Sequence, residues 1–269
     1  RLLKKAKNLK IIVMPSMGIN HIDVEACKKY GVKLHYLAQN KEFIRSIHST
    51  SEYTLGLILN LLKKYQPSSK SVLDTGNWQA TEYRGFDIQN KTLGIIGYGN
   101  IGTQLAKIIS GLDVNIIKYD PYIEQLDSSY VDLDTLLTTS DIITLHVPLT
   151  DETNGMINKE CFGKMNNVYF INASRGEVVN SQDLIDALKL KHVNSAALDV
   201  ISNESPSGVD DHILVEYART HDNMIITPHC AGSTNNRLRQ IYKYTAETIE
   251  ANIEYNSCLT EKKLLYLIY

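Results

Sequence analysis

The sequence of 269 residues is short of several features that would assign it to particular classes of protein. Its four cysteines, Cys27, Cys161, Cys230 and Cys258, are widely spread and include no Cys-x-x-Cys pair. Neither a zinc site nor a disulfide framework is therefore indicated, and we expect no metal site. Free thiols are typical of a reduced compartment, so we expect a cytoplasmic protein.

Long apolar runs and runs of one charge are also missing. The longest apolar stretch, Leu55 to Leu62, is interrupted by Gly56 and Asn60 and falls well short of the roughly 20 residues of a membrane span. The net charge is −2 and no basic run is present, which argues against a nucleic-acid partner. We therefore expect a small polar molecule as the partner, and neither a membrane nor a nucleic acid.

The chain also lacks an initiating methionine. It opens with Arg1-Leu2-Leu3-Lys4-Lys5, the pattern of a helix already under way, so we expect that an N-terminal part is missing. The length is long for one domain and sufficient for two, by a rough prior of about 150 residues per domain. Hydrophobic residues make up 43% of the chain, which is enough to bury full cores.

The first segment alternates between helix and strand. We predict a helix end at Leu2 to Lys7, a strand at Leu9 to Val13, a helix at Ile22 to Lys29 and a strand at Val32 to Leu37. This order indicates a small parallel sheet, incomplete as it stands. The turn between the first strand and its helix, Ser16 to Asn20, is either an ordinary loop or a turn that holds a substrate carboxylate.

A long helix is predicted from Ser51 to Tyr65. It is apolar nearly all round, so it must be covered on most sides, by both domains or by a second subunit. Residues 66–90 lack clear periodicity and are predicted to form a long irregular arm. Such an arm is either a subunit contact or a surface linker.

The stretch that follows has the strongest pattern in the chain. Thr92 to Ile96 is predicted as a short buried strand, the three glycines at 97, 99 and 102 follow Gly-x-Gly-x-x-Gly, and Ile101 to Ser110 has helical spacing. Gly97 can take backbone angles that a Cβ forbids, Gly99 allows close approach of a pyrophosphate, and Gly102 allows tight packing of helix on strand. The exposed amides at the start of the helix would then face the anion.

A second strand, Val114 to Tyr119, ends in Asp120. A carboxylate at this position can accept hydrogen bonds from adenosine ribose hydroxyls and repel a 2′-phosphate. Three glycines alone are weak evidence, but two strands, a helix and the acidic residue together predict a dinucleotide site that prefers NAD to NADP.

Further strands and helices repeat the unit. We predict helices at Leu133 to Thr138, Asp183 to Leu190 and Arg237 to Tyr255, and short apolar strands at Ile142 to Val147, Val168 to Asn172, Ala196 to Val200 and Met224 to Thr227. Each strand is followed by polar residues, and ligands of open α/β sheets bind beyond the carboxyl ends of the strands. These residues should therefore line one crevice, and the last helix could return to the first sheet.

Three residues near these strand ends suit acid–base and anion chemistry. Arg175 could clamp a carboxylate through two parallel bonds, or be a surface arginine. His229 follows Pro228 and could carry a proton, or be a structural histidine. Glu204 could orient and charge that histidine, or be an exposed loop residue. None of the three is specific when taken alone.

Taken together with their surroundings, they resemble those of a known family. The chain is similar to the D-isomer-specific 2-hydroxyacid dehydrogenases, which include phosphoglycerate, D-lactate, glycerate and glyoxylate or hydroxypyruvate enzymes. The resemblance runs from about Leu9 to His229 and beyond. It is carried by TSEYTLGL (50–57), LGIIGYGNIG (93–102), YDPY (119–122), SDIITLHVPLT (140–150), INASRG (171–176), AALDV (196–200) and TPHCAGST (227–234).

The resemblance implies a fold, a cofactor and roles for residues. It implies a Rossmann-type, doubly wound parallel sheet for the NAD domain, residues 49–231, and a smaller flavodoxin-like substrate domain made of residues 1–48 and the returning segment 232–269. The catalytic residues would be Arg175, Glu204 and His229, and the substrate-binding residues Ser16, Met17, Gly18 and Arg175. Contacts to NAD are expected from Gly97, Gly99, Asn100, Ile101, Gly102, Asp120, His146, Val147, Pro148, Ala173 and Asp199.

The implied activity is hydride transfer between NAD(H) and a small D-2-hydroxy acid or 2-oxo acid, in a homodimer. Met14 to Gly18 contains no arginine, which many phosphoglycerate enzymes have there, so a small or apolar 2-oxo acid is favoured. Asn20 replaces the family's usual acidic residue, and the family starts several dozen residues earlier. Two alternatives stay open: an NAD-sensing, corepressor-like binding module, and a dehydrogenase that uses another electron donor such as formate or phosphite.

Overall fold

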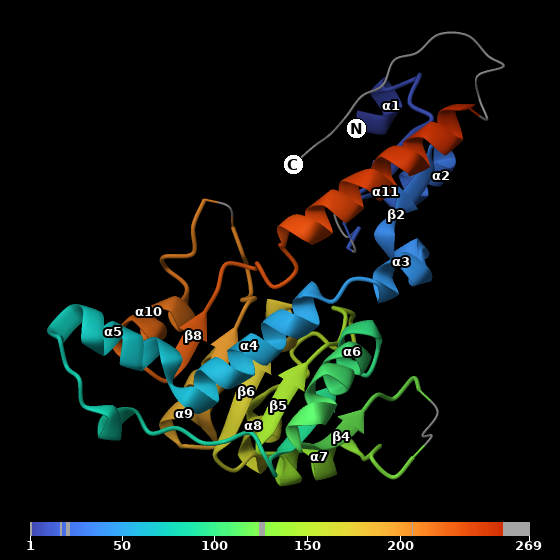
Figure 1. The fold of residues 1–269 in the computed structure, drawn as a ribbon. Coiled ribbons are helices and arrows are strands. Elements are labelled where there is room, and N and C mark those ends of the chain that lie inside the picture. The colour runs from blue at the N-terminus through green and yellow to red at the C-terminus, as the bar shows by residue number, and fades with distance from the viewer. Residues whose placement is uncertain (1, 17, 20–21, 124–126, 206, 255–269) are drawn as a thin grey trace. The chain divides into compact units, whose positions relative to one another are not determined.

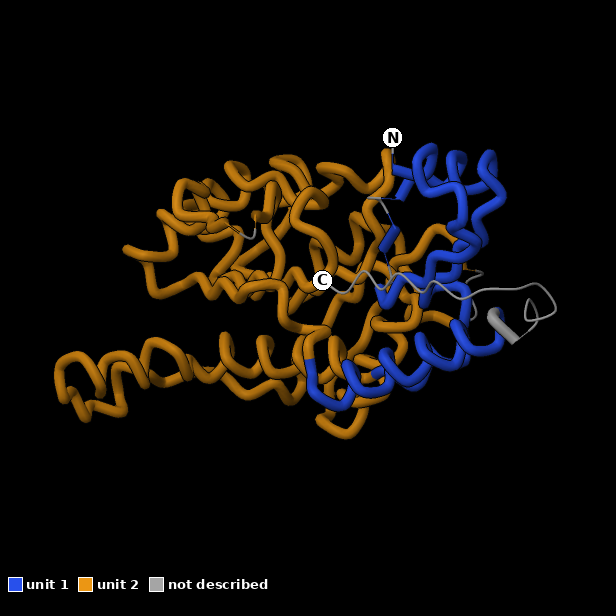
Figure 2. The backbone as a smooth tube through the Cα atoms, turned by 90° about the horizontal axis from the view of Figure 1, so that it is seen from above, with its two compact units in different colours: residues 1–47, 234–269 blue, residues 48–233 orange. Residues whose placement is uncertain are grey.

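The computed structural model describes residues 2–16, 18–19, 22–123, 127–205 and 207–254. The chain forms two compact units, coloured separately in Figure 2. Unit 1 consists of residues 1–47 and 234–269, and unit 2 of residues 48–233. The chain therefore passes from one unit to the other twice, after Ile47 and after Ser233.

Unit 2 is built on a six-stranded sheet in which every paired strand is parallel to its neighbour. The strand order is β4-β3-β5-β6-β7-β8, and helices cover both faces (Figure 1). The predicted doubly wound α/β fold is confirmed. The strands are β3 (Thr92–Ile96), β4 (Asn115–Tyr119), β5 (Ile142–Leu145), β6 (Val168–Asn172), β7 (Val193–Leu198) and β8 (Met224–Ile226).

The order of the strands reverses beside β3. Leu93 of β3 is aligned with Ile116 of β4 on one side and with Ile142 of β5 on the other. The chain therefore first builds outward to β4 and then returns to build the rest of the sheet from β5. In open parallel sheets, the carboxyl ends of the two strands at such a reversal border the ligand crevice.

Two hydrophobic cores lie on the two faces of this sheet. Successive side chains of a strand point to opposite faces. In β6, for example, Val168 and Phe170 belong to one core, and Tyr169 and Ile171 to the other. Both faces are therefore buried, which explains why β3, β5 and β6 are nearly continuous apolar runs rather than alternating with polar residues. The helices of this unit are α4 (Ser49–Lys63), α5 (Tyr65–Thr75), α6 (Asn100–Ile109), α7 (Leu133–Thr139), α8 (Lys159–Lys164), α9 (Ser181–Lys189) and α10 (Ile213–Thr220).

The predicted long apolar helix is α4. Its side chains Leu57, Ile58, Leu61 and Leu62 are buried, in the core that also contains residues of α6. The helix contacts α6, β6 and β7, so its own unit already covers much of its surface. It ends at Lys64, which adopts a left-handed conformation with φ 54°.

The prediction of an irregular arm at residues 66–90 is wrong for its first part, because residues 65–75 form α5. Pro67 is the third residue of this helix, where a missing backbone N–H breaks no helical hydrogen bond. The helix has no buried residue, and so no apolar period that periodicity could have revealed. After Gly76, with φ 68°, the chain returns through a short 3₁₀ turn (η2, Ala80–Tyr83) towards β3.

Three short helices were not predicted from the sequence, and one strand begins earlier than predicted. The helices are α3 (Lys41–Arg45), α8 and α10. The side chain of Asn158 defines the start of α8 by accepting hydrogen bonds from the amides of Glu160 and Cys161, at 3.0 and 3.3 Å. Strand β7 runs three residues earlier at its start than the predicted Ala196, and Asp199 lies just beyond its end.

Unit 1 contains a two-stranded parallel sheet, in agreement with the prediction. Ile11 of β1 (Ile11–Met14) is aligned with Lys33 of β2 (Lys33–Tyr36). The last helix, α11, packs on β1, and the ring of its Tyr244 stacks on Phe43 at 4.8 Å. The helices of this unit are α1 (Leu2–Lys5), α2 (Val24–Lys29), α3 and α11 (Asn235–Glu254).

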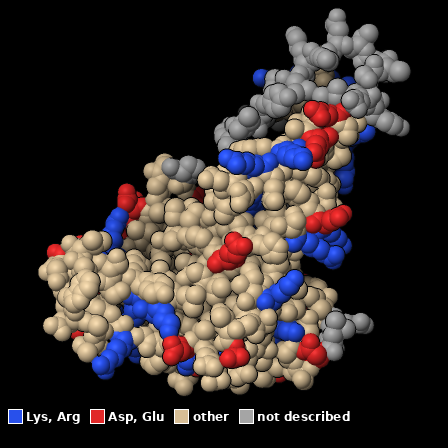
Figure 3. All heavy atoms as spheres, in the orientation of Figure 1, with Lys and Arg blue, Asp and Glu red and all other residues tan. Residues whose placement is uncertain are grey.

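The surface carries both signs of charge. On the face shown in Figure 3, Lys and Arg side chains are interspersed with Asp and Glu side chains. Among the described residues, no helix combines the length and the apolar character needed to cross a membrane.

Candidate active site

The three glycines of the β3–α6 turn do not all serve the same purpose. Gly97 has φ +90°, and a Cβ there would lie 2.7 Å from the carbonyl oxygen of His146. A Cβ on Gly102 would lie 2.4 Å from the carbonyl oxygen of Gly97. A Cβ on Gly99 would meet no atom within 4 Å, so this glycine leaves open space beside the turn. Two glycines thus allow the turn itself to pack, and the third leaves room for a ligand.

The start of α6 lies directly after this turn. Gly99 is the N-cap residue, and it has no side chain to cap the first amides, which belong to Asn100, Ile101 and Gly102. Amides at a helix start carry partial positive charge and bind anions, phosphate groups in particular. The turn therefore has the chemistry of a pyrophosphate site.

Asp120 lies immediately after β4 and is bonded to the glycine turn. One carboxylate oxygen accepts a hydrogen bond from the amide of Tyr98 at 2.9 Å, and the other accepts one from the amide of Tyr122 at 3.0 Å. A carboxylate has about four acceptor positions, so two amides leave capacity for ribose hydroxyls. The side chain of Tyr122 is hydrogen-bonded to Glu152, which connects the loops after β4 and β5.

His146 lies on the other side of the strand reversal, after β5. Its amide donates to the carbonyl of Ile96 at 2.8 Å, and its Nε2 lies 3.1 Å from the hydroxyl of Thr144. Its Nδ1 is buried and has no hydrogen-bond partner in the part of the chain that the structure describes. Burial lowers the pKa of His146 to about 3, so the ring is neutral near pH 7. The next residue, Val147, packs against Gly97, and the carbonyl of Pro148 accepts a hydrogen bond from Thr153.

A buried asparagine holds the turn that carries Arg175. Asn172, at the end of β6, is 1% exposed. Its side-chain oxygen accepts from the amide and hydroxyl of Ser174 at 3.0 and 2.8 Å, and its nitrogen donates to the carbonyl of Arg175 at 2.9 Å. Ala173, between them, is also buried. The buried side chain of Asn172 therefore fixes the backbone position of Arg175.

The Arg175 turn touches the loop that carries Glu204. A Cβ on Gly176 would lie 1.9 Å from the carbonyl carbon of Ile201, so the two backbones are in close contact. The amide of Ile201 donates to Oε1 of Glu204 at 3.1 Å. Glycine at position 176 thus brings the arginine and the glutamate loops together.

Glu204 and His229, which are 25 residues apart in the sequence, form a close pair. Nδ1 of His229 lies 2.6 Å from Oε2 of Glu204. The side chains are 49% and 35% exposed, so the pair is accessible from solvent. A ring bonded through Nδ1 keeps Nε2 available for another molecule, which is the arrangement expected of a proton carrier.

The His229 turn is held by Asp199, in the way that Asn172 holds the Arg175 turn. His229 has φ +50°, which is uncommon for a residue with a side chain. Its amide donates to the carbonyls of Asp199 and Thr227, at 2.9 and 3.0 Å. The carboxylate of Asp199 is 1% exposed and accepts bonds from the hydroxyl of Thr227 and the amides of Cys230 and Ala231, at 2.6, 3.0 and 2.8 Å.

The predicted substrate loop belongs to unit 1. The hydroxyl of Ser16 donates to the carbonyl of Gly18 at 2.8 Å, and the carbonyl of Ser16 accepts from the amide of Leu37 at 3.3 Å. Met17 lies outside the described residues. Ser16 is thus bonded to the segment after β2, and its hydroxyl is already engaged with the carbonyl of Gly18.

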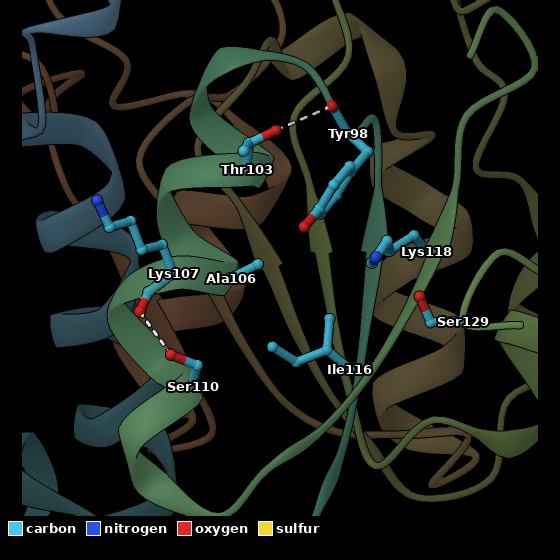
Figure 4. Close-up of a pocket in the computed structure, with 8 residues that line it drawn as sticks. All are labelled: Tyr98, Thr103, Ala106, Lys107, Ser110, Ile116, Lys118 and Ser129. Atoms are coloured by element: carbon cyan, nitrogen blue, oxygen red, sulfur yellow. Dashed lines mark hydrogen bonds between the residues drawn. The ribbon is translucent and has the colours of Figure 1, made fainter. Parts of the chain in front are cut away.

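A hollow of about 410 Å³ lies on the α6 face of β4, next to the glycine turn (Figure 4). Tyr98 and Lys118 point into it, and Ile116 forms part of its floor. Lys118 is the basic residue nearest to Asp120 in the sequence. Its ammonium lies 4.6 Å from the ring centre of Tyr98 and 3.3 Å from a carboxylate oxygen of Asp127. This cation is therefore engaged with other groups and not directed at a ribose bound by Asp120.

The sequence named candidate reactive residues but not the residues that bond to their turns. Asn172, Thr227 and Cys230 had no assigned function, although all three lie inside the polar segments that follow the strands. The available signal was a polar residue directly after an apolar strand, where burial forces its polar atoms to find partners. Which partners they find depends on segments far away in the sequence.

The family model and the similar proteins all belong to one group of enzymes. Residues 55–231 match the model of the D-isomer specific 2-hydroxyacid dehydrogenase NAD-binding domain. A D-3-phosphoglycerate dehydrogenase of Archaeoglobus fulgidus is 37% identical over 253 residues, which are 92% of this chain and 46% of that protein. A hydroxypyruvate reductase of Thermotoga maritima is 35% identical over 243 residues, 89% of this chain and 76% of that protein.

A solved structure is similar in both fold and sequence. The D-lactate dehydrogenase of Aquifex aeolicus, crystallised with NAD and lactic acid, has a TM-score of 0.81 and 32% sequence identity, over 94% of this chain and 79% of that one. The chain thus spans about half the length of the phosphoglycerate enzyme and about three quarters of the reductase and the lactate enzyme.

Proposed function

This chain belongs to the D-isomer specific 2-hydroxyacid dehydrogenase family, and we propose that it transfers hydride between NAD(H) and a small D-2-hydroxy acid or 2-oxo acid. The observation that carries the proposal is the 2.6 Å pair of His229 and Glu204 beside the Arg175 turn. This oxidation needs an oriented imidazole that carries a proton and a cation that binds the substrate carboxylate, and the arginine turn lies against the loop of Glu204.

The residues at the strand reversal fit NAD. The open space beside Gly99, the backbone amides at the start of α6 and the partly filled acceptor positions of Asp120 suit a pyrophosphate and a ribose. Within the described residues the buried Nδ1 of His146 has no hydrogen-bond partner, and a bound dinucleotide would supply one. The NAD contacts proposed are those of Gly97, Gly99, Asn100, Ile101, Gly102, Asp120, His146, Val147, Pro148, Ala173 and Asp199.

Bound NAD⁺ would supply a hydride acceptor. The protein's own groups would move the proton and bind the carboxylate. When the C2–H bond of a hydroxy acid breaks, the electron pair leaves with the hydrogen and the hydroxyl proton must leave too. Nε2 of His229 takes that proton, while Glu204 holds Nδ1 and stabilises the charged ring. Arg175 binds the carboxylate and polarises the C2 oxygen. In the reduction of a 2-oxo acid, the proton moves back from His229.

The substrate is proposed to be small. Ser16, Met17 and Gly18 would bind it together with Arg175, and the segment Met14 to Gly18 offers no cation for a phosphate. We therefore propose a 2-oxo acid with a short or apolar side chain. In this proposal residues 49–231 are the NAD domain, and residues 1–48 and 232–269 belong to the substrate domain.

We further propose that the protein is a cytoplasmic homodimer. The helix α5, which has no buried residue, and the segment after it expose several large apolar side chains, among them Tyr65 at 59%, Leu73 at 81% and Trp78 at 85%. Apolar side chains gathered on one segment favour a protein contact. Sedimentation that shows a monomer at micromolar concentration would contradict the dimer.

The activity is tested by a panel of 2-oxo acids offered to the full-length protein with NADH, following NADH absorbance. Substrate-dependent oxidation that is lost in His229→Ala would support the proposal. Reduction of NAD⁺ by formate or phosphite, with no hydroxy acid present, would replace it with the other dehydrogenase class. Binding of NADH without any turnover would favour the corepressor-like module.

A further inference from the structure

A tyrosine of α4 is connected to the turn that carries His229. Tyr53 is the fifth residue of α4, and its Oη lies 3.1 Å from Sγ of Cys230, the residue after His229. The sulfur lies in turn 3.6 Å from Oδ1 of Asp199. Burial raises the pKa of Tyr53, and its bond to Cys230 acts in the same direction, so the phenol is protonated near neutral pH.

These contacts complete a small polar network around Asp199. The carboxylate already accepts from two backbone amides of the turn and from the hydroxyl of Thr227. The thiol of Cys230 can donate to the same carboxylate, in which case its sulfur accepts from Tyr53. The network thus joins α4 to residues on both sides of His229.

The network matters because His229 holds a conformation that is unfavourable by itself. A left-handed backbone at a residue with a side chain costs about 1 kcal/mol or more, and it persists only where the surroundings determine it strongly. The amide of Cys230 is bonded to Asp199, and its side chain is one contact through which α4 reaches the turn, beside the hydrogen bond between the side chains of Tyr53 and Thr227. A loosened turn would displace the imidazole relative to Glu204.

We propose that Tyr53 is a positioning residue for proton transfer by His229, acting through the Cys230 thiol and the Asp199 carboxylate. The inference deepens the proposed dehydrogenase function and rests on it for its effect on turnover. Its effect on the imidazole itself does not require turnover. The two effects can therefore be measured separately.

The first experiment observes the ring directly. In protein labelled with ¹³C in its histidine rings, His229→Ala identifies the His229 signal. Tyr53→Phe, which keeps the ring and removes only the hydroxyl, is expected to shift or broaden that signal. The matched control is Tyr217→Phe, since Tyr217 is also mostly buried and donates a single hydrogen bond, to Asn223 at 3.3 Å, away from the turn. A His229 signal that Tyr53→Phe leaves in place would overturn the proposal, whether or not the protein turns over a 2-oxo acid.

The second experiment measures turnover. Tyr53→Phe is expected to lower kcat on the order of fivefold, the effect of one hydrogen bond, while NADH affinity stays unchanged and Tyr217→Phe, which also removes one hydrogen bond, has no effect on kcat. Cys230→Ala should lower kcat similarly, and Cys230→Ser should restore part of it. In the double variant Tyr53→Phe/Cys230→Ala the loss should not exceed that of Cys230→Ala alone. Additive losses would mean that Tyr53 does not act through Cys230, and a wild-type protein without turnover would count against the dehydrogenase function only.

Discussion

At the β3–α6 turn the chain makes room by omitting side chains, whereas at the ends of β6 and β7 it fixes its turns with buried ones. Gly97 and Gly102 stand where a Cβ would strike backbone, and Gly99 leaves space. Asn172 and Asp199 are each 1% exposed and bond to several groups of the turns that follow them. A ligand held by backbone amides needs close approach, while side chains that act on a substrate need a fixed direction, and the turn after β3 and the turns after β6 and β7 suit these different needs.

The largest expected effect is at the His229 turn. His229→Ala removes the proposed proton carrier, and such a group is typically worth about 10²- to 10⁴-fold in rate. We expect kcat with a 2-oxo acid and NADH to fall by that factor, with NADH affinity nearly unchanged because the imidazole acts on the substrate. Steady-state kinetics and fluorescence titration of NADH measure the two quantities. Near wild-type turnover would mean that the proton moves through another group or through water.

The next prediction separates two glycines of the same turn. Gly102→Ala puts a Cβ 2.4 Å from a backbone oxygen, and overpacking of this kind typically costs about 1–3 kcal/mol of the free energy of unfolding. Gly99→Ala puts it into open space, so stability should hold while NADH affinity falls. Urea unfolding and NADH titration of both variants make the test. Equal losses of stability would mean that the glycines do not have the separate functions assigned to them.

His146 is the exception on the glycine side, a buried polar side chain with an unpaired nitrogen in the described structure. Its pKa of about 3 lies below the unfolded value of about 6.5, so between these values the unfolded chain binds a proton that the folded chain does not. Stability is therefore full above about pH 6.5 and decreases as the pH falls, by about 2 kcal/mol at pH 5. Urea unfolding at pH 7.5 and 5 measures this.

A histidine variant checks the cause of that pH dependence. His146→Asn should reduce the slope of stability against pH but not abolish it, because burial also lowers the pKa of His212. An unchanged slope in His146→Asn would assign the acid sensitivity to other groups.

The difference between the glycine turn and the turns after β6 and β7 also explains which parts of the candidate site could be predicted from the sequence. The glycine turn and Asp120 form a local pattern of 24 residues between Gly97 and Asp120 inclusive, so spacing alone located them. The pairing of Glu204 with His229 came from the family resemblance, and the structure brings these two residues to 2.6 Å. The buried supports were not predictable in this way, because Asp199 bonds to residues some 30 positions away and Tyr53 to a residue 177 positions away.

The helix α5 was missed for the opposite reason. Periodicity detects a helix through its buried face, and α5 buries no residue. The left-handed Lys64 that separates it from α4 is not encoded by a glycine or an asparagine, so no turn signal marks the junction. The buried supports and the helix α5 were missed for one physical reason. The hydrophobic pattern of a sequence indicates which residues are buried. It does not indicate which polar groups bond to each other, or which exposed segments are helical.

The smallest effect is expected at Asp120, a charged side chain bonded to the glycine turn. Neither Pro121 nor Tyr122 offers a cation, and Lys118 is engaged by Tyr98 and Asp127, so a 2′-phosphate would meet an uncompensated carboxylate. We expect NADH to be preferred to NADPH by about tenfold in kcat/KM, which corresponds to about 1.4 kcal/mol. Asp120→Ala should narrow this preference, mainly by weakening NADH. Asp127→Ala, which frees Lys118 and leaves Asp120 in place, serves as the comparison, because it tests whether that lysine can reach the phosphate. Equal kcat/KM values for the two cofactors in the wild-type protein would show that Asp120 does not select between them.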